Sequence, residues 1–281
     1  MSTLLSAGRI VSISNSKLLR LFCLSTFLVT LAALILVPFM SLNAPKAYAS
    51  GMFDTSVTGG AYFQNLSGHL AVGNSVNGFI PTNITPSDIG LQTTKTAPVF
   101  KVAFLILYSN SVSFTYVPYV YGGSKVLSES IIFNGQTYNI STPVTSKLDL
   151  YSYKLFYTHD FSINRFAEIG IGAGVNVMTA KAELDSPVLS ESKNVNLPLP
   201  VIGGKLKISP LNNISFIGKF QGFTIGSKGY YYHIKAGVNY EAVGPLSVFA
   251  DYVYDKIHVD TNGVDGSLAF DGPEAGLRLG F

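Results

Sequence analysis

Residues 229–241, which read GYYYHIKAGVNYE, alternate between two kinds of side chain. One face of this segment carries the apolar or aromatic residues Tyr230, Tyr232, Ile234, Ala236, Val238 and Tyr240. The other face is mostly polar or small and carries Tyr231, His233, Lys235, Gly237, Asn239 and Glu241. A period of two is typical of a β-strand with one apolar face. Residues 165–177 and 272–281 repeat the pattern, so the chain is predicted to contain several amphipathic strands.

Ten such segments follow one another after residue 50, separated by clusters of Gly, Pro, Asn, Asp and Ser. The predicted strands are 56–65, 98–108, 111–121, 147–158, 165–177, 198–208, 213–224, 229–241, 246–257 and 272–281. The predicted long connections are 66–97, 122–146, 178–197 and 258–271, with 225–228 a short exception, and the tight ones are 109–110, 159–164, 209–212 and 242–245. This alternation predicts an all-β fold, an antiparallel up-and-down barrel of about ten strands, with eight as the alternative count.

The composition of the chain excludes two broad classes of protein. Only 12% of the 281 residues are charged and 47% are hydrophobic, whereas an ordinary soluble domain has about 25% charged residues. Disordered chains combine high charge with low hydrophobicity, and nucleic-acid-binding proteins need a strongly basic surface. We therefore expect neither disorder nor a nucleic-acid partner.

Residues 1–49 differ from the rest and are predicted to be a signal peptide, with 50–281 as the exported domain. Residues 1–20 carry bases and no acid, residues 21–37 form an uncharged apolar run, and the small residues Ala47 and Ala49 then mark a cleavage site. A basic, an apolar and a small-residue region in this order are typical of a secretory signal. Cleavage removes the only cysteine, so no disulfide is available to the exported chain.

The exported chain is better explained by a transmembrane barrel than by a soluble sandwich. Its longest apolar run is residues 102–108, far shorter than the roughly 20 residues of a transmembrane helix. The apolar strand faces are broad and aromatic, which suits lipid outside a closed barrel. Tyrosines predicted at the strand ends of this face suit the membrane–water boundary; they are Tyr108, Tyr116, Tyr121, Tyr157, Tyr230, Tyr240 and Tyr254.

The signal, the cysteine-free exported chain, the amphipathic strands and the terminal residues 276–281, GLRLGF, resemble a Gram-negative outer-membrane β-barrel protein of the small porin-like or OmpW/opacity type. The resemblance covers the exported chain as architecture and about the last ten residues as a motif. It implies insertion into the lipid of the bacterial outer membrane, with the barrel assembly machinery and periplasmic chaperones as partners. It also implies that Leu277, Leu279 and Phe281 form the assembly signal.

The polar strand faces are predicted to line the lumen. The charged residues assigned to it are Lys101, Lys154, Glu168, Lys205, Lys207, Lys219, Lys235, Glu241, Asp251, Asp255, Glu274 and Arg278. Seven bases and five acids are nearly balanced, and a barrel of about ten strands is narrow. Two interpretations remain open: a salt-bridged core that holds the barrel shut, and a narrow pore that favours small anions.

No residue pattern predicts catalysis, a cofactor or a metal site. None of the four histidines has the spacing of a zinc site. Omptin proteases are ten-stranded barrels with paired acids and an Asp–His pair at the outer rim. Here His258, Val259 and Asp260 near Asp255 give the reverse order, and Asp88 has no acidic neighbour in its loop. A lipid hydrolase would need Ser and His at the outer rim, but His159 and Ser162 fall in a predicted periplasmic turn.

We therefore expect a non-enzymatic outer-membrane barrel, either structural or a narrow passive channel for a small solute. The alternative is a surface protein that binds a host or surface ligand through the polar outer loops 66–97, 122–146 and 178–197, since loops on a rigid scaffold often carry binding sites. An omptin-like or lipid-modifying enzyme is the remote third possibility.

Overall fold

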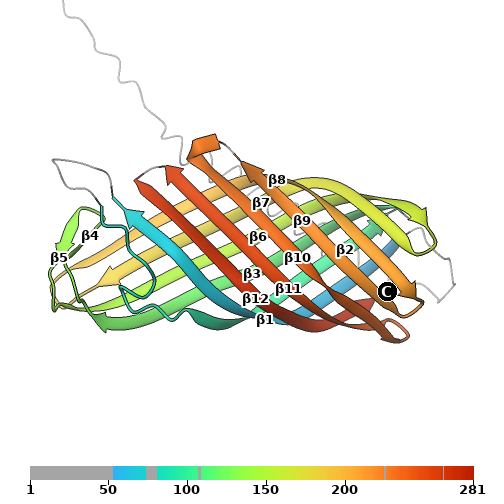
Figure 1. The fold of residues 1–281 in the computed structure, drawn as a ribbon, viewed down its shortest axis with the longest axis horizontal. Helices are drawn as coiled ribbons and strands as arrows, with labels where there is room; N and C mark the ends of the chain where they lie inside the picture. Colours follow the sequence, from blue (N-terminus) through green and yellow to red (C-terminus); the bar gives the residue numbers. More distant parts are fainter. Residues whose placement is uncertain (1–52, 74–80, 107–108, 225, 262) are drawn as a thin grey trace, which may run out of the picture. The chain divides into compact units, whose positions relative to one another are not determined.

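The computed structural model describes residues 53–73, 81–106, 109–224, 226–261 and 263–281. The chain divides into residues 1–50 and a compact unit of residues 51–281. The described part of this unit forms a closed antiparallel barrel of ten strands (Figure 1), which confirms the predicted fold class and count. The predicted signal segment, with Ala47 and Ala49, lies outside the described residues. Within the described ranges, no helix has the length and hydropathy needed to cross a membrane.

Strands around the barrel follow the order β1-β12-β11-β10-β9-β8-β7-β6-β3-β2, and β4 pairs with β5 in a separate hairpin. The elements are β1 (Phe53–Val72), β2 (Thr94–Ile106), β3 (Asn110–Val126), β4 (Ile131–Phe133), β5 (Gln136–Tyr138), β6 (Pro143–Asn164), β7 (Ala167–Asp185), β8 (Ser190–Leu211), β9 (Ile214–Thr224), the 3₁₀ turn η1 (Gly226–Lys228), β10 (Gly229–Val243), β11 (Leu246–Thr261) and β12 (Val264–Gly280).

The first and last strands close the barrel. Thr58 on β1 lies opposite Arg278 on β12 and also opposite Lys101 on β2. The amide of Phe281 donates to the carbonyl of Thr55 at 2.8 Å, and the amide of Thr55 donates back at 3.2 Å. Closure satisfies the backbone groups that would otherwise be exposed at two sheet edges.

Most strands are longer than predicted, and the extra length lies mainly at one end. The predicted loop 178–197 is wrong, because β7 and β8 continue through it to a turn after Asp185. The predicted loop 258–271 is likewise strand in β11 up to Thr261 and in β12 from Val264, and the predicted turn 159–164 belongs to β6. Charged residues in 178–197 suggested a loop, although the alternation of small and polar residues continues there.

The two ends of the barrel differ. The chain terminus Phe281 and the short turns before β3, β7, β9 and β11 lie at one end, which corresponds to the periplasmic end of such barrels. The β4–β5 hairpin and the connection around residues 81–93 lie at the other end (Figure 1). We call these the periplasmic and the outer end.

An apolar band covers the outside of the barrel. Large apolar side chains are exposed there on successive strands, as expected for a surface that meets lipid. They include Phe63, Phe100, Tyr157, Ile169, Ile171, Ile202, Leu206, Phe216, Phe220, Ile234, Val238, Tyr240, Val248, Tyr252, Leu277 and Leu279.

The inside of the barrel holds an apolar core, which we call the lumen plug. Its residues are Tyr62, Leu66, Leu91, Val99, Tyr119, Tyr121, Leu148, Leu150, Phe156, Met178, Val201, Tyr231, Val253, Ile257 and Phe270. Tyr121 therefore faces the lumen, and its predicted place in the outer aromatic belt is wrong. Tyr116 and Tyr121 are five residues apart, an odd number, so a regular strand cannot present both on one face.

A second apolar cluster lies at the outer end; we call it the outer lid. It consists of Val72, Ile84, Leu127, Ile131, Phe133, Tyr138, Val144 and Leu184. The hydroxyl of Tyr138 donates to the carbonyl of Leu184 at 2.8 Å, which attaches the β4–β5 hairpin to β7. Burial raises the pKa of Tyr138 to about 12, so this hydroxyl keeps its proton at neutral pH.

Candidate functional site

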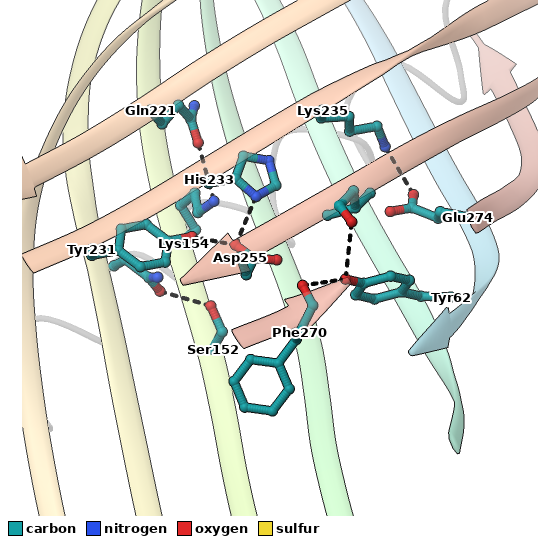
Figure 2. A network of polar contacts seen from close by, with 12 residues as sticks. Tyr62, Ser152, Lys154, Gln221, Tyr231, His233, Lys235, Asp255, Phe270 and Glu274 are labelled. Carbon is teal, nitrogen blue, oxygen red and sulfur yellow. Dashed lines mark hydrogen bonds and ion pairs between the residues drawn. The ribbon is translucent and has the colours of Figure 1, made fainter. Parts of the chain in front are cut away.

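The polar centre of the lumen is the carboxylate of Asp255 on β11, which is only 2% exposed. Tyr231 donates its hydroxyl to Oδ1 at 2.9 Å, and Tyr119 donates to Oδ2 at 3.0 Å. Nδ1 of His233 lies 2.8 Å from Oδ1 (Figure 2). Three partners from β3 and β10 thus satisfy one buried anion, as a buried charge requires.

Further polar side chains extend this network across the lumen. Lys154 on β6 donates to Oε1 of Gln221 on β9 at 3.0 Å (Figure 2), and its ammonium lies 5.3 Å from the ring centre of Tyr231. Ser152 donates to Oδ1 of Asn176 on β7 at 2.8 Å. Because these contacts join strands that are not all neighbours, they fix the barrel wall from within.

Lys235 on β10 pairs with two carboxylates in the lumen. Its ammonium lies 2.9 Å from Glu274 (Figure 2). It also lies 2.6 Å from Asp251. Both carboxylates therefore share one base, and all three side chains are largely withdrawn from solvent.

A cavity of about 160 Å³ lies beside this network. Nine of the predicted lumen charges line it: Lys101, Lys154, Lys205, Lys219, Lys235, Asp251, Asp255, Glu274 and Arg278. The remaining three, Glu168, Lys207 and Glu241, line a wider hollow of about 720 Å³ toward the periplasmic end. The structure thus brings the twelve residues together along one lumen, in two adjoining spaces.

The wider hollow contains two more ion pairs. Lys205 lies 2.7 Å from Asp160, and Lys207 lies 3.8 Å from Glu168. Asp160 was not among the predicted lumen residues, because residues 159–164 were assigned to a turn. The alternation of Thr158, Asp160 and Ser162 with aromatic and apolar neighbours was the signal that could have placed it in a strand.

The contacts of Asp255 with Tyr119, Tyr231 and His233 were not predicted. The alternation places Tyr119 on the polar face of β3, together with Thr115 and Val117, and that pattern could have identified it. His233 was assigned to the lumen without a role. Its pairing with Asp255 depends on the register between β10 and β11, which a single sequence does not specify.

Asp255 and His258, two of the residues considered for an omptin-like site, lie on opposite faces of β11. Asp255 points into the lumen, whereas His258 follows it by three residues and packs against Tyr230 on the opposite face. Nδ1 of His258 lies 3.0 Å from the carbonyl oxygen of Gly266. Among the described residues, no group of three His, Cys, Asp or Glu side chains is placed to hold a metal ion.

Comparison with known proteins identifies structures of similar fold but no family. No family model matches the chain, and no curated protein sequence matches it. The outer membrane protease OmpT from Escherichia coli is similar in structure, with a TM-score of 0.54 at 10% identity over 84% of this chain and 100% of that one.

Two further barrels are similar at lower scores. The attachment invasion locus protein Ail of Yersinia pestis has a TM-score of 0.37 at 12% identity over 82% of this chain and 100% of that one. The transport unit of the autotransporter AIDA-I from Escherichia coli has a TM-score of 0.38 at 12% identity over 85% and 93%. The chain has the fold of an outer-membrane β-barrel, and its apolar outer band fits a surface that meets lipid.

Proposed function

We propose that this chain is a non-enzymatic structural barrel of the outer membrane whose lumen is closed by its own side chains. The observation that carries the proposal is the lumen plug, in which fifteen buried apolar residues occupy the interior of the barrel. A conducting pore needs a continuous polar path through the lumen. A barrel of about ten strands is narrow, so inward side chains are large enough to interrupt that path.

Aromatic contacts join the plug residues of β1, β3 and β12. The ring centres of Tyr119 on β3 and Phe270 on β12 are 4.4 Å apart, and those of Tyr121 and Phe270 are 6.0 Å apart. The hydroxyl of Tyr62 donates to the carbonyl of Phe270 at 2.9 Å (Figure 2). The outer lid adds a second apolar layer at the outer end. A solute that enters from the outer end would meet both layers before reaching the polar cavity.

A structural role without catalysis also fits the polar network. Asp255 and His233 are buried partners that face the plug, and each hydrogen bond around them joins one strand to another. Such a network stabilises the barrel by linking its walls. Likeness to OmpT in fold supplies no catalytic residue, because folds carry many functions.

Single-channel recording tests the proposal. The full-length protein, purified from outer membranes in detergent, is expected to give no discrete conductance steps in planar bilayers. The double substitution Tyr119→Ala and Phe270→Ala removes two rings from the plug and is expected to produce steps. Phe63→Ala with Phe100→Ala is the matched control, because these rings are exposed on the outside. Steps from the unaltered protein would overturn the closed barrel and support the narrow channel.

Binding at the outer end is a second candidate function, favoured by exposed apolar residues there. Val126, Ile140 and Val188 are 59%, 58% and 84% exposed, and none belongs to the outer band of the membrane-spanning region. Large contiguous apolar patches outside the membrane mark interaction surfaces, and the candidate depends on these three residues acting together. An adhesion assay separates this function from a purely structural one. Cells that display the unaltered protein are compared with cells that display the Val188→Ser or Ile140→Ser variant at an equal surface level, and binding predicts weaker adhesion of the variants.

A further inference from the structure

Two rows of inward-facing residues bring positive charges together near the periplasmic end of the lumen. On one wall, Lys219 on β9 lies directly opposite Lys205 on β8 and Lys235 on β10. On another wall, Thr58 on β1 separates Lys101 on β2 from Arg278 on β12. Like charges directly opposite each other in a sheet are destabilising, so this arrangement needs a compensating partner.

Acidic residues compensate only part of this charge. Lys235 is paired with Asp251 and Glu274, and Lys205 is paired with Asp160. Within the described ranges, no carboxylate lies within 4.0 Å of the side-chain nitrogens of Lys101, Lys219 or Arg278. These three residues, which we call the central cations, are therefore left without a carboxylate partner.

The central cations lie close enough to interact electrostatically. Lys101 interacts electrostatically with Arg278 on its own wall and with Lys219 on the other wall, and Lys205 and Lys235 add to the positive field at Lys219. Water screens such repulsion poorly in a partly buried site. A bound anion would remove the repulsion.

An open space is present where the three side chains meet. The central cations line both the cavity of about 160 Å³ and the wider hollow of about 720 Å³, so they lie where the two adjoin. The hydroxyl of Ser111 lines both spaces and offers a neutral donor. The smaller cavity is below the ~300–1,000 Å³ of pockets for drug-sized ligands and suits a small ion.

The acids that line the smaller cavity are already occupied. Six bases and three acids line it. Asp255 accepts from Tyr119 and Tyr231, and the other two acids share Lys235. The unpaired charge facing the cavity is therefore positive.

We propose that Lys101, Lys219 and Arg278 form a binding site for a small oxyanion of the phosphate class, which enters from the periplasmic end. Arginine presents a planar fork of donors that matches two oxygens of such an anion, and lysines add point charges. The lumen plug lies beyond the site, so the anion binds in a closed vestibule and does not cross the barrel. Anion binding goes beyond the proposed structural role, and only the closed inner end of the vestibule rests on that role.

Equilibrium dialysis of radiolabelled inorganic phosphate against the full-length protein in detergent tests the site. The double variant Lys101→Gln and Lys219→Gln is expected to weaken phosphate binding at least tenfold. The matched control is Lys95→Gln with Lys228→Gln, which removes two exposed lysines and the same charge. This control is expected to bind as the unaltered protein does. Arg278→Lys keeps the charge but loses the fork, and a smaller loss is expected.

A stability measurement gives a second readout. Ligand that binds only the folded state raises its stability, so phosphate is expected to raise the unfolding midpoint of the unaltered protein more than chloride at equal ionic strength. The Lys101→Gln and Lys219→Gln variant is expected to unfold at a higher midpoint without phosphate and to lose the phosphate response. Equal effects of chloride and phosphate, or equal binding by this variant and the control, would overturn the proposal. Conductance does not enter either measurement, so failure of the closed barrel and failure of the anion site are distinguishable.

Discussion

Nδ1 of His233 lies 2.8 Å from Oδ1 of Asp255, and the two residues are direct cross-strand neighbours on β10 and β11. The pair lies at the boundary between the lumen plug and the cationic cavity. Asp255 also accepts from Tyr119 on β3, so a single carboxylate links two distant sectors of the barrel wall.

Replacing Asp255 is therefore expected to destabilise the barrel strongly. Asp255→Ala leaves two tyrosine hydroxyls and an imidazole without their buried acceptor, and each hydrogen bond to a charged group contributes about 1.5–3 kcal/mol. Urea unfolding of the refolded protein in detergent measures the change. Asp265→Asn, at an exposed position on β12, is the control and is expected to change the free energy of unfolding by less than about 0.5 kcal/mol. Equal stability of the two variants would show that the network contributes nothing.

Tyr121 faces the lumen, although its place near a strand end suggested the outer aromatic belt. Its hydroxyl donates to Oε1 of Gln64 at 3.0 Å inside the lumen, whereas Tyr116 packs on Tyr153 on the outer face. Tyr121→Phe is expected to lower the free energy of unfolding by about 0.5–1.5 kcal/mol, the usual net contribution of a hydrogen bond. Tyr116→Phe should leave stability nearly unchanged. If the two substitutions had the reverse effect, the register of β3 would be shifted by one residue.

The strands and their inward residues could be predicted because polar and apolar side chains alternate with a period of two along most of residues 50–281. Lys235 and Glu274 fall on polar faces that follow directly from alternation, and the structure places both at the cavity. The pairing between them required the register of three strands, which depends on contacts far apart in sequence. The strand ends that extend beyond the lipid were not predicted. Charged residues such as Lys181 and Glu183 lie on the outward face there, because no lipid surrounds that part of the strand, and they interrupt the apolar pattern.

The N-terminal segment, outside the described residues, gives a prediction about processing. We propose that residues 1–49 are a signal peptide that is removed after Ala49, because a small residue at this site and at Ala47 fits signal peptidase cleavage. Mass spectrometry of the protein from outer membranes is expected to show a chain that begins at Ser50. Ala49→Phe should block cleavage and leave the longer chain in the inner membrane. An exported chain that retains Met1 to Ala49 would contradict this.

The C-terminal strand gives the last prediction. Leu277 and Leu279 are exposed in the outer band, and the backbone of Phe281 is paired with Thr55 at the seam where the barrel closes. We propose that Leu277, Leu279 and Phe281 form the signal that the barrel assembly machinery reads before closure. Phe281→Ala removes the exposed ring but keeps both backbone hydrogen bonds, so it is expected to lower the amount of assembled barrel several-fold without changing export. Val243→Ala, an equally exposed residue beside a turn at the same end, is the control. Assembled barrel is measured as the band that migrates faster in unboiled than in boiled samples on a gel, since a closed barrel stays compact until heated. If Phe281→Ala and Val243→Ala gave equal fast-migrating bands, the terminal phenylalanine would have no part in assembly.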